Sequence, residues 1–351
     1  MINIGIIGTG FGSKVHVPGF RNIPNVQVYG ITGDSFSKTK KIAKQLNIPN
    51  TYSSWQELIN DEKIDAISIA TPPHIHKDIV TSALKNSKAI LCEKPFGKTL
   101  QDAQAMTKSV KKQKMANAVD FEFRYVPEFQ YLKTLLDKKL IGDIRYVSIN
   151  WITGGRASIN AKINWSNYKK YGGGILANYG SHVIDYIEWL INPIQKVNAN
   201  LSIVKQSKKN IDAEDTCEIK AILKNNVKAS VLITNVVFGG EGHTIEIFGS
   251  KGTLKLSNPN LFDFMQGFSI VHINGKTEKE KKLITPKKFG TISSKVKDGR
   301  IYAFTELAKD FISPIKNKKN KPPSFEDGLR AHIVMQSIRD SDKKDCWTTV
   351  K

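Results

Sequence analysis

The sequence predicts an α/β protein with two domains: an N-terminal doubly wound parallel sheet and a C-terminal α+β domain with a large, mostly antiparallel open sheet. Strands and helices alternate up to about residue 119, with near-continuous apolar strands, and a glycine-rich turn follows the first strand directly. After about residue 120 the pattern changes to short strands broken by Asn and Gly turns. Such apolar strands are typical of a sheet covered on both faces. Because 351 residues exceed one small core, we expect domains at 1–119 and 120–351.

The elements follow this division in order. The first domain is predicted to contain strands near 2–7, 26–32, 66–73, 88–94 and 115–121, with helices at 37–47, 76–87 and 100–113 between them. The second is predicted to contain strands near 143–152, 196–204, 216–225, 226–238, 243–250 and 252–257, with helices at 127–140, within 172–191 and at 325–341.

Composition narrows the class of protein. Hydrophobic residues make up 40% and charged residues 24%, which is ordinary for a soluble globular chain. No apolar run has the length of a membrane helix, and the N-terminus does not resemble a signal peptide. The three cysteines are sparse and lack metal-ligand spacing. We therefore expect a cytoplasmic protein without disulfides, a metal site or a membrane partner.

The chain is strongly basic, with 53 Lys and Arg against 32 Asp and Glu and a net charge of +21. The lysines are spread along the whole chain, and the densest runs, 205–210, 276–282 and 316–323, lack interleaved aromatic residues. This favours a solvated surface over a specific nucleic-acid partner. The excess charge can still attract an anionic cofactor or small-molecule substrate.

The turn after the first strand indicates a dinucleotide site. Gly8 permits a tight turn, Gly10 lets the backbone approach a pyrophosphate, and the next helix begins there with its positive end. The third small position of the usual fingerprint would be Ser13. We expect the cofactor to contact the whole turn, namely Gly8, Thr9, Gly10, Phe11 and Gly12.

Asp34, just beyond the second strand, favours NAD over NADP. A carboxylate at this point binds the adenosine ribose hydroxyls. Lys38, Lys40 and Lys41 follow on the next helix and would suit a 2′-phosphate instead, but an exposed helix face is the preferred explanation for them. The sequence thus predicts NAD or NADP, with NAD preferred.

Two segments at the carboxyl ends of strands, 70–76 and 92–97, should line the nicotinamide end of the cofactor site. The residues expected there are Thr71, Pro72, His76, Glu93 and Lys94. The Lys94 ammonium can hydrogen-bond a substrate oxygen and stabilise alkoxide character as hydride leaves. Glu93 can compensate its charge. The alternative is a purely structural Glu–Lys pair.

The segment 172–186 supplies the second candidate. Asn178, His182 and Asp185 share one face of the predicted helix. A histidine there can take the proton of a hydroxyl if a neighbour fixes its tautomer, and Asn178 or Asp185 would be that neighbour. The alternative is a hydrogen-bonded core histidine.

Six segments in this order resemble the Gfo/Idh/MocA oxidoreductases over nearly the whole chain. They are "GIIGTGFG", "ATPPHIH", "CEKPFG", "FRYVPEF", "GGGILANYGSHVID" and "SFEDGLRAH". The resemblance implies a Rossmann domain, followed by a domain whose sheet often forms a homo-oligomer interface, in a dimer or tetramer. It implies NAD(P)-dependent chemistry on a sugar, polyol or nucleotide sugar.

The resemblance also implies residue roles. Lys94 matches the lysine that contacts substrate and nicotinamide, in a Lys94–Pro95 peptide that is often cis. His182 matches the usual proton acceptor, and Arg124, Tyr125 and Trp165 match positions lining the substrate pocket.

One position departs from the pattern of inositol-dehydrogenase-like members. They carry a carboxylate four residues before the histidine, where this chain has Asn178. An amide can orient an imidazole but cannot stabilise its charged form as an anion does. Asn178 and the basic surface together favour one alternative to the dehydrogenase, a non-catalytic NAD(P)-binding sensor. A second alternative, independent of Asn178, is an NAD-dependent glycosidase using transient hydride transfer.

Overall fold

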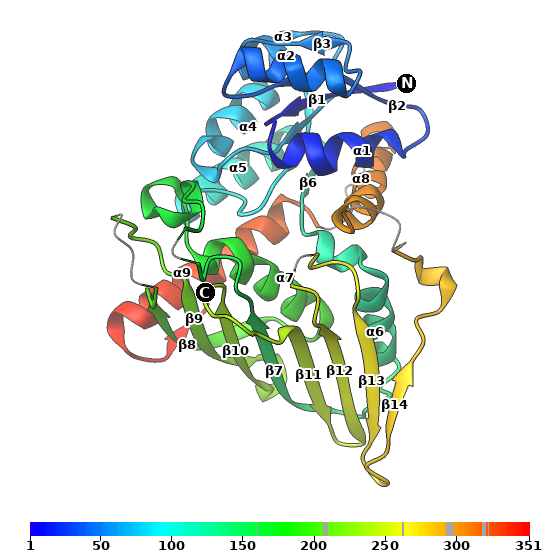
Figure 1. Ribbon diagram of the computed structural model, residues 1–351, viewed down its shortest axis with the longest axis vertical. Coiled ribbons are helices and arrows are strands. Elements are labelled where there is room, and N and C mark those ends of the chain that lie inside the picture. The colour runs from blue at the N-terminus through cyan, green and yellow to red at the C-terminus, as the bar shows by residue number, and fades with distance from the viewer. Residues whose placement is uncertain (159, 206–209, 262, 293–297, 318–320, 322) are drawn as a thin grey trace. The chain divides into compact units, whose positions relative to one another are not determined.

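The computed structural model describes residues 1–158, 160–205, 210–261, 263–292, 298–317, 321 and 323–351 (Figure 1). The chain forms two compact units, which are described one at a time. The first contains Met1–Glu122 and Arg300–His332, and the second contains Phe123–Gly299 and Ile333–Lys351.

The first unit is built on a six-stranded sheet with the order β3-β2-β1-β4-β5-β6, and every neighbouring pair is parallel. This is the strand order typical of a dinucleotide-binding sheet, with its switch point between β1 and β4. The strands are β1 (Ile2–Ile7), β2 (Val26–Thr32), β3 (Asn50–Thr51), β4 (Ala66–Ile69), β5 (Ala89–Cys92) and β6 (Asn117–Val119). All residues of β4, β5 and β6 are buried, so helices or loops cover both faces.

Helix α1 packs against α8, α4 packs against α3 and α5, and α2 packs against β2 and β3. The helix bounds are α1 (Val17–Arg21), α2 (Phe36–Gln45), α3 (Trp55–Asn60), α4 (His76–Lys85), α5 (Leu100–Gln113) and α8 (Arg300–Asn317). Local chemistry sets where they begin. The Thr99 hydroxyl accepts the backbone N–H of Asp102 at 3.1 Å, a cap worth about 1 kcal/mol to α5.

The second unit is built on a nine-stranded sheet with the order β14-β13-β12-β11-β7-β10-β9-β8-β15. The β7–β10 pair is parallel and the other pairs are antiparallel. The strands are β7 (Ile144–Ile152), β8 (Ile194–Ser202), β9 (Thr216–Leu223), β10 (Lys228–Thr234), β11 (Gly242–Gly249), β12 (Gly252–Asn258), β13 (Ser269–Asn274), β14 (Glu280–Leu283) and β15 (Thr348–Thr349). Side chains of β9 alternate between buried and accessible, as expected for a sheet with one face in the core.

Two helices supply core side chains to this second unit. Helix α6 (Pro127–Asp137) packs against β12 and β13, and α7 (Ser181–Leu190) packs against α6. Phe129 of α6 and Tyr186 of α7 are fully buried and meet edge to face at 5.4 Å. Helix α9 (Phe325–Lys344) contributes residues to both units.

Residues 300–332 fall in the first unit, whereas the sequence placed them in the second domain. The reason is helix α8, which the sequence analysis did not identify. Phe304 of α8 stacks on His16 at 4.2 Å and meets Phe20 edge to face at 5.2 Å. A Cβ atom on Gly19 would lie 2.4 Å from the Phe304 ring, so helix α1 approaches α8 closely at this glycine.

Of the three lysine-rich runs, 276–282 is exposed, as expected. Most of the run 205–210 and half of the run 316–323 lie outside the described residues. No helix in the described part of the chain has the length and apolarity needed to cross a membrane.

Candidate active site

The glycine turn joins β1 to a π-helical turn, η1 (Gly12–His16), that leads into α1. Gly8 has φ +120°, and a Cβ there would lie 2.3 Å from the Ala70 carbonyl oxygen, so only glycine fits. Around Gly10 there is open space for a ligand. A Cβ on Gly12 would lie 2.9 Å from the Ile6 side chain, so Gly12 allows the close packing that the sequence analysis assigned to Ser13. Ser13 instead bonds back to the Thr9 carbonyl at 2.7 Å.

Two further residues of the turn differ in exposure. Thr9 is buried against the Gly33 backbone, whereas Phe11 is partly exposed. The Arg300 guanidinium lies over the Phe11 ring at 5.0 Å. Arg300 is 289 residues away in the sequence, so no local pattern could have predicted this cation beside the turn.

Asp34 is exposed just beyond β2, where a ribose-binding carboxylate is expected. Lys38, Lys40 and Lys41 are exposed on α2. The Lys40 ammonium lies 4.4 Å from the centre of the Phe36 ring on the same helix.

His76 joins two loops at the carboxyl edge of the first sheet. Its ring is fully buried, with Nε2 2.8 Å from the Thr71 carbonyl oxygen and Nδ1 3.1 Å from that of Phe96. Burial lowers its pKa, which keeps the ring neutral. His76 therefore connects the loop of Thr71 to that of Phe96, and its predicted contact with the cofactor stays a prediction. Thr71 and Pro72 are partly exposed on the loop that it holds.

Lys94 follows β5 in a cis Lys94–Pro95 peptide and is partly exposed. Its backbone N–H donates to Glu93 Oε2 at 3.1 Å. Burial lowers the pKa of the Lys94 ammonium, and the charges of Glu93, Glu122 and Asp120 act in the opposite direction. An amine with a lowered pKa at the carboxyl edge of a parallel sheet is suited to acid–base or hydrogen-bonding chemistry.

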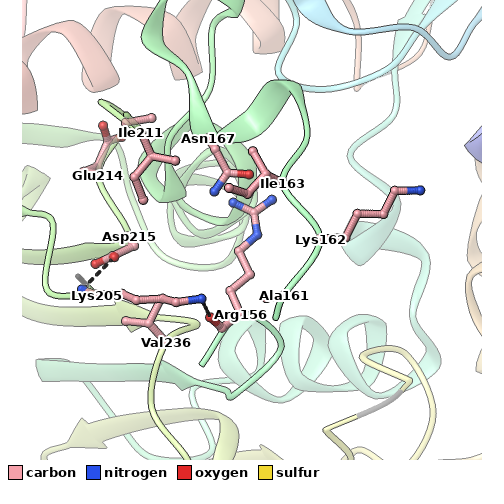
Figure 2. Close-up of a pocket in the computed structure, with 11 residues that line it drawn as sticks. Arg156, Ala161, Lys162, Ile163, Asn167, Lys205, Ile211, Glu214, Asp215 and Val236 are labelled. Atoms are coloured by element: carbon pink, nitrogen blue, oxygen red, sulfur yellow. Dashed lines mark hydrogen bonds between the residues drawn. The ribbon is translucent and has the colours of Figure 1, made fainter. Parts of the chain in front are cut away.

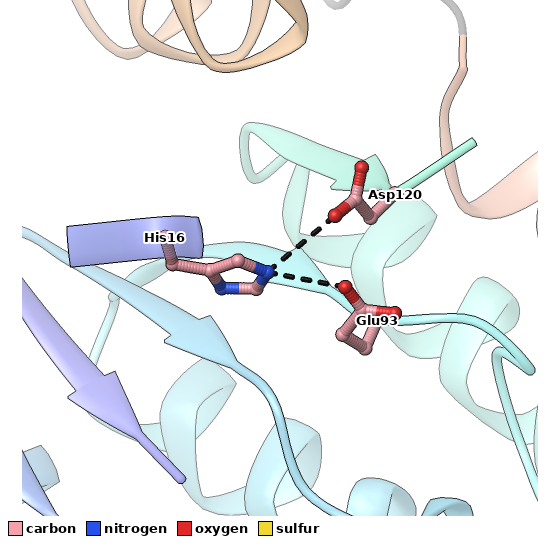
Figure 3. Close-up of side chains that lie close together, drawn as sticks. All are labelled: His16, Glu93 and Asp120. Atoms are coloured by element: carbon pink, nitrogen blue, oxygen red, sulfur yellow. Dashed lines mark hydrogen bonds and ion pairs between the residues drawn. The ribbon is translucent and has the colours of Figure 1, made fainter. Parts of the chain in front are cut away.

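Glu93 also belongs to a buried cluster that the sequence analysis did not identify. Figure 3 shows the His16 ring pointing at the carboxyl groups of Glu93 and Asp120, with Nε2 3.1 Å from Glu93 Oε1 and 3.4 Å from Asp120 Oδ2. Asp120 follows β6 as Glu93 follows β5. The rule that ligands gather at the carboxyl ends of parallel strands would have pointed to it.

In the second unit, His182 lies buried at the start of α7. The chain enters α7 through a π-helical turn, η6 (Leu176–Gly180), that includes Asn178, so the predicted helix is not regular through this segment. Such turns are frequent at functional sites. The Phe123 ring meets the His182 ring edge to face at 4.9 Å, and the Trp151 ring is 6.5 Å away.

Asp185 and Arg124 form an ion pair that the sequence analysis did not anticipate. Arg124 Nε donates to Asp185 Oδ2 at 2.9 Å, and Nη2 donates to Oδ1 at 2.6 Å. Both side chains are largely buried. The pair joins the segment that carries Arg124 and Tyr125 to helix α7, three residues after His182.

The turn that carries Trp165, η4 (Trp165–Asn167), is fixed from both sides. Asn164 Oδ1 accepts the N–H of Ser166 at 2.9 Å, and Asn167 Oδ1 accepts the N–H of Asn164 at 3.1 Å. The Arg156 guanidinium donates to Asn164 Oδ1 at 3.3 Å and also to the Ser166 hydroxyl.

Arg156 points into a pocket of the second unit (Figure 2). Lys205 lines the same pocket, and its ammonium donates to the carbonyls of Arg156 and Ser158 at 2.6 and 2.5 Å. Burial lowers the pKa of Arg156 and raises that of Glu214, which lines the same pocket. Arg156 bonds to Asn164 and Ser166, and Lys205 bonds to the carbonyls of Arg156 and Ser158. These two side chains therefore hold the turn that carries Trp165 in place.

A family model described as "Oxidoreductase family, NAD-binding Rossmann fold" (GFO_IDH_MocA) matches residues 2–121. The corresponding "GFO/IDH/MocA C-terminal domain" model matches residues 129–255. The two matches follow one another in the same order as the two predicted domains.

Similar proteins cover nearly the whole chain. An uncharacterized oxidoreductase of Synechocystis sp. is 30% identical, with 99% of this chain and 96% of the relative aligned. Levoglucosan dehydrogenase of Pseudarthrobacter phenanthrenivorans is 24% identical over 99% of this chain and 98% of its own. Glucose-6-phosphate 3-dehydrogenase of Bacillus subtilis is 24% identical over 97% of each chain.

Among solved structures, levoglucosan dehydrogenase in complex with NADH and levoglucosan superposes with a TM-score of 0.90 at 25% identity. The match covers 100% of this chain and 99% of that one.

Proposed function

Because the chain belongs to the Gfo/Idh/MocA oxidoreductase family, we propose that it is an NAD-dependent dehydrogenase acting on a hydroxyl carbon of a sugar, polyol or nucleotide sugar. The observation that carries this proposal is Lys94, an amine with a lowered pKa at the carboxyl edge of an NAD-binding sheet. Relatives that act on levoglucosan and glucose 6-phosphate support the substrate class.

The glycine turn fits a dinucleotide, since Gly10 leaves open space and Gly8 holds a conformation only glycine adopts readily. Bound NAD accepts or donates the hydride. In the proposal, Asp34 binds the adenosine ribose. Thr71 and Pro72 lie along the nicotinamide, and His76 holds their loop.

In the proposed reaction, the Lys94 ammonium hydrogen-bonds the substrate oxygen and stabilises the negative charge that develops on it. His182 exchanges the hydroxyl proton, and Asn178 orients its ring. Tyr125 and Trp165 line the substrate pocket. Arg124 and Asp185 act on the site through their ion pair, which fixes the start of α7.

The proposal is tested with a substrate panel of levoglucosan, glucose 6-phosphate, free hexoses, inositols and nucleotide sugars. NAD reduction is followed by absorbance, and binding by the shift of the unfolding midpoint. A dehydrogenase reduces NAD with at least one of these compounds and is stabilised by NADH. Release of a sugar without net NAD reduction would instead show a glycosidase.

Asn178 is the observation that favours a non-catalytic sensor, because no carboxylate stands at that position to stabilise an imidazolium. A sensor would bind NADH and reduce nothing across the panel. Asn178→Asp separates the two functions: in a dehydrogenase it alters an existing rate, and in a sensor derived from one it introduces turnover.

We also propose a cytoplasmic homo-oligomer. The three cysteines are free, and two of them are buried, which suits a reducing compartment. The wide sheet of the second unit offers a surface for self-association, and light scattering gives the mass directly. A monomer at micromolar concentration would contradict this part.

A further inference from the structure

The buried cluster of His16, Glu93 and Asp120 contains more acceptors than donors. One ligand-type atom from each residue lies within 4.8 Å of the other two. His16 and Asp120 are 0% and 1% exposed, and Glu93 is 8% exposed. Two carboxylates this close cannot both stay charged away from water without strong compensation.

The hydrogen bonds of His16 and Glu93 identify where donors are supplied. His16 Nδ1 lies 2.8 Å from the Ser68 hydroxyl, and Nε2 lies 3.1 Å from Glu93 Oε1. An Nε2–H donating to Glu93 and a Ser68 O–H donating to Nδ1 satisfy both contacts. Glu93 Oε2 accepts the backbone N–H of Lys94. Each Glu93 oxygen therefore has a donor.

Asp120 is in the opposite situation. Within the described part of the chain, neither of its buried oxygens accepts a hydrogen bond, and His16 Nε2 lies 3.4 Å from its Oδ2. A proton on Asp120 resolves this, because the resulting O–H can donate to Glu93. Burial and the charges of Glu93 and Glu122 raise the pKa of Asp120 well above its usual range. Burial acts to raise the pKa of Glu93, but the hydrogen bonds from His16 and Asp120 together with neighbouring charges, including that of Lys94, lower it overall.

Lys94 is the cation next to this pair. The ionisable groups of the first unit that act on it are Glu93, Glu122, Asp120 and Arg300, with His16 behind the carboxyl pair. If Asp120 carries a proton, the pair has one negative charge instead of two. That charge lies on Glu93, the residue bonded to the Lys94 backbone.

We propose that Asp120 is a positioning residue for Lys94: Asp120 and Glu93 share one proton, so that the buried pair carries a single negative charge and holds the Lys94 turn through a fully hydrogen-bonded Glu93. This inference rests on the proposed role of Lys94 in hydride transfer. The shared proton itself is a property of the folded protein and is measurable without turnover.

Infrared difference spectroscopy of the cofactor-free protein measures the proton directly. At pH 7, wild type minus Asp120→Asn should show a protonated carboxylic-acid C=O band that shifts in deuterium oxide and persists into alkaline pH. The matched control is Asp102→Asn. Asp102 pairs with Lys77 at 2.9 Å and has a lowered pKa, so this variant should remove a carboxylate band. A carboxylate band lost from Asp120→Asn would overturn the proposal.

One ligand-type atom each from His16, Glu93 and Asp120 could also hold a metal ion in place of the shared proton, and elemental analysis tests this alternative. A stoichiometric divalent metal in the purified protein that is lost in Asp120→Asn would replace the proton and overturn the proposal. No metal above trace level is the expected result.

Kinetics test the positioning role. Asp120→Asn keeps a neutral donor to Glu93 and should retain kcat within about threefold, whereas Asp120→Ala should lose tenfold or more with little change in NADH affinity. Glu93→Gln removes the charge and should shift the alkaline limb of the pH–rate profile down by about one to three pH units. Equal kcat in Asp120→Ala and wild type would refute the positioning role. If Lys94→Ala retains turnover, the proposed function is wrong. The infrared measurement would still show whether Asp120 and Glu93 share a proton.

Discussion

Arg124 and Asp185 are joined by two parallel hydrogen bonds of 2.9 and 2.6 Å, and only 11% and 2% of their side chains are exposed. This geometry is the strong form of an ion pair, because a planar guanidinium matches a carboxylate at two points. It connects the motif that carries Tyr125 to the helix that carries His182.

Removing one partner of this pair should be costly. Asp185→Ala leaves the guanidinium buried without its carboxylate, and we expect a loss of about 3–5 kcal/mol in the free energy of unfolding. Urea denaturation measures it. The exposed pair Lys139–Asp143 is the control, and Asp143→Ala should change stability by less than about 1 kcal/mol. An equal loss of unfolding free energy in Asp185→Ala and Asp143→Ala would show that the buried Arg124–Asp185 pair stabilises the protein no more than an exposed pair.

Asp34 should decide the choice of cofactor. Replacing it with alanine removes the carboxylate expected to bind the ribose hydroxyls. We expect the NAD-to-NADP ratio of kcat/KM to fall at least tenfold, with NADP use rising as the repulsion of its 2′-phosphate is lost. Asp78→Ala, at an exposed position of α4, is the control. An unchanged ratio would remove Asp34 from the cofactor site.

His243 should make the protein lose stability as the pH falls. Burial lowers its pKa to about 3, against 6.5 in the unfolded chain, and Tyr186 Oη lies 2.9 Å from its Nε2. The unfolded state therefore binds more protons between pH 3 and 6.5, and stability that is complete above 6.5 declines below it by up to about 1.4 kcal/mol per pH unit. Urea unfolding at pH 5.0, 5.5, 6.0 and 6.5 measures the slope.

Two variants test whether His243 causes this pH dependence of the unfolding free energy. His243→Gln should reduce it by about one proton, whereas Tyr186→Phe keeps the buried imidazole and should retain it. An unchanged slope in His243→Gln would show that His243 is charged or exposed in the folded state.

Arg156 should affect substrate binding through the turn that carries Trp165. Arg156→Ala removes the bonds to Asn164 and Ser166, so we expect KM for the substrate to rise several-fold while kcat changes less and NADH affinity is retained. Lys162 lines the same pocket and is exposed, so Lys162→Ala is the control. A normal KM in Arg156→Ala would separate that turn from the substrate site.

Patterns that depend on neighbours in sequence predicted much of this fold. The predicted helix at 100–113 coincides with α5, because a regular amphipathic run lies between the Thr99 cap and the left-handed Lys114. The parallel sheet followed from apolar strands. Helix α8 was missed although Phe304, Leu307 and Phe311 are spaced for a buried helix face. Its return to the first unit depends on contacts with Gly19 and His16, almost 300 residues earlier in the chain.

Part of the candidate site could likewise be predicted from neighbours in sequence, and part could not. Lys94, Asp34 and the glycine turn each follow a strand end, so a rule about parallel sheets could find them. The Arg124–Asp185 pair joins residues 61 apart, and the His16–Glu93–Asp120 cluster joins the helical turn η1 to the ends of β5 and β6. Such partners depend on three-dimensional packing. The carbonyl partners of His76, Thr71 and Phe96, likewise come from two loops that no local pattern brings together.

The most direct test of the account compares hydride transfer by Lys94→Ala with that by Lys98→Ala, an exposed lysine four residues further on. Single-turnover absorbance at saturating NAD and substrate isolates the chemical step, and titration with NADH measures cofactor affinity in the same samples. The account predicts that Lys94→Ala loses at least a thousandfold in rate and binds NADH within about threefold of wild type, while Lys98→Ala matches wild type in both. A Lys94→Ala rate within tenfold of wild type would contradict it.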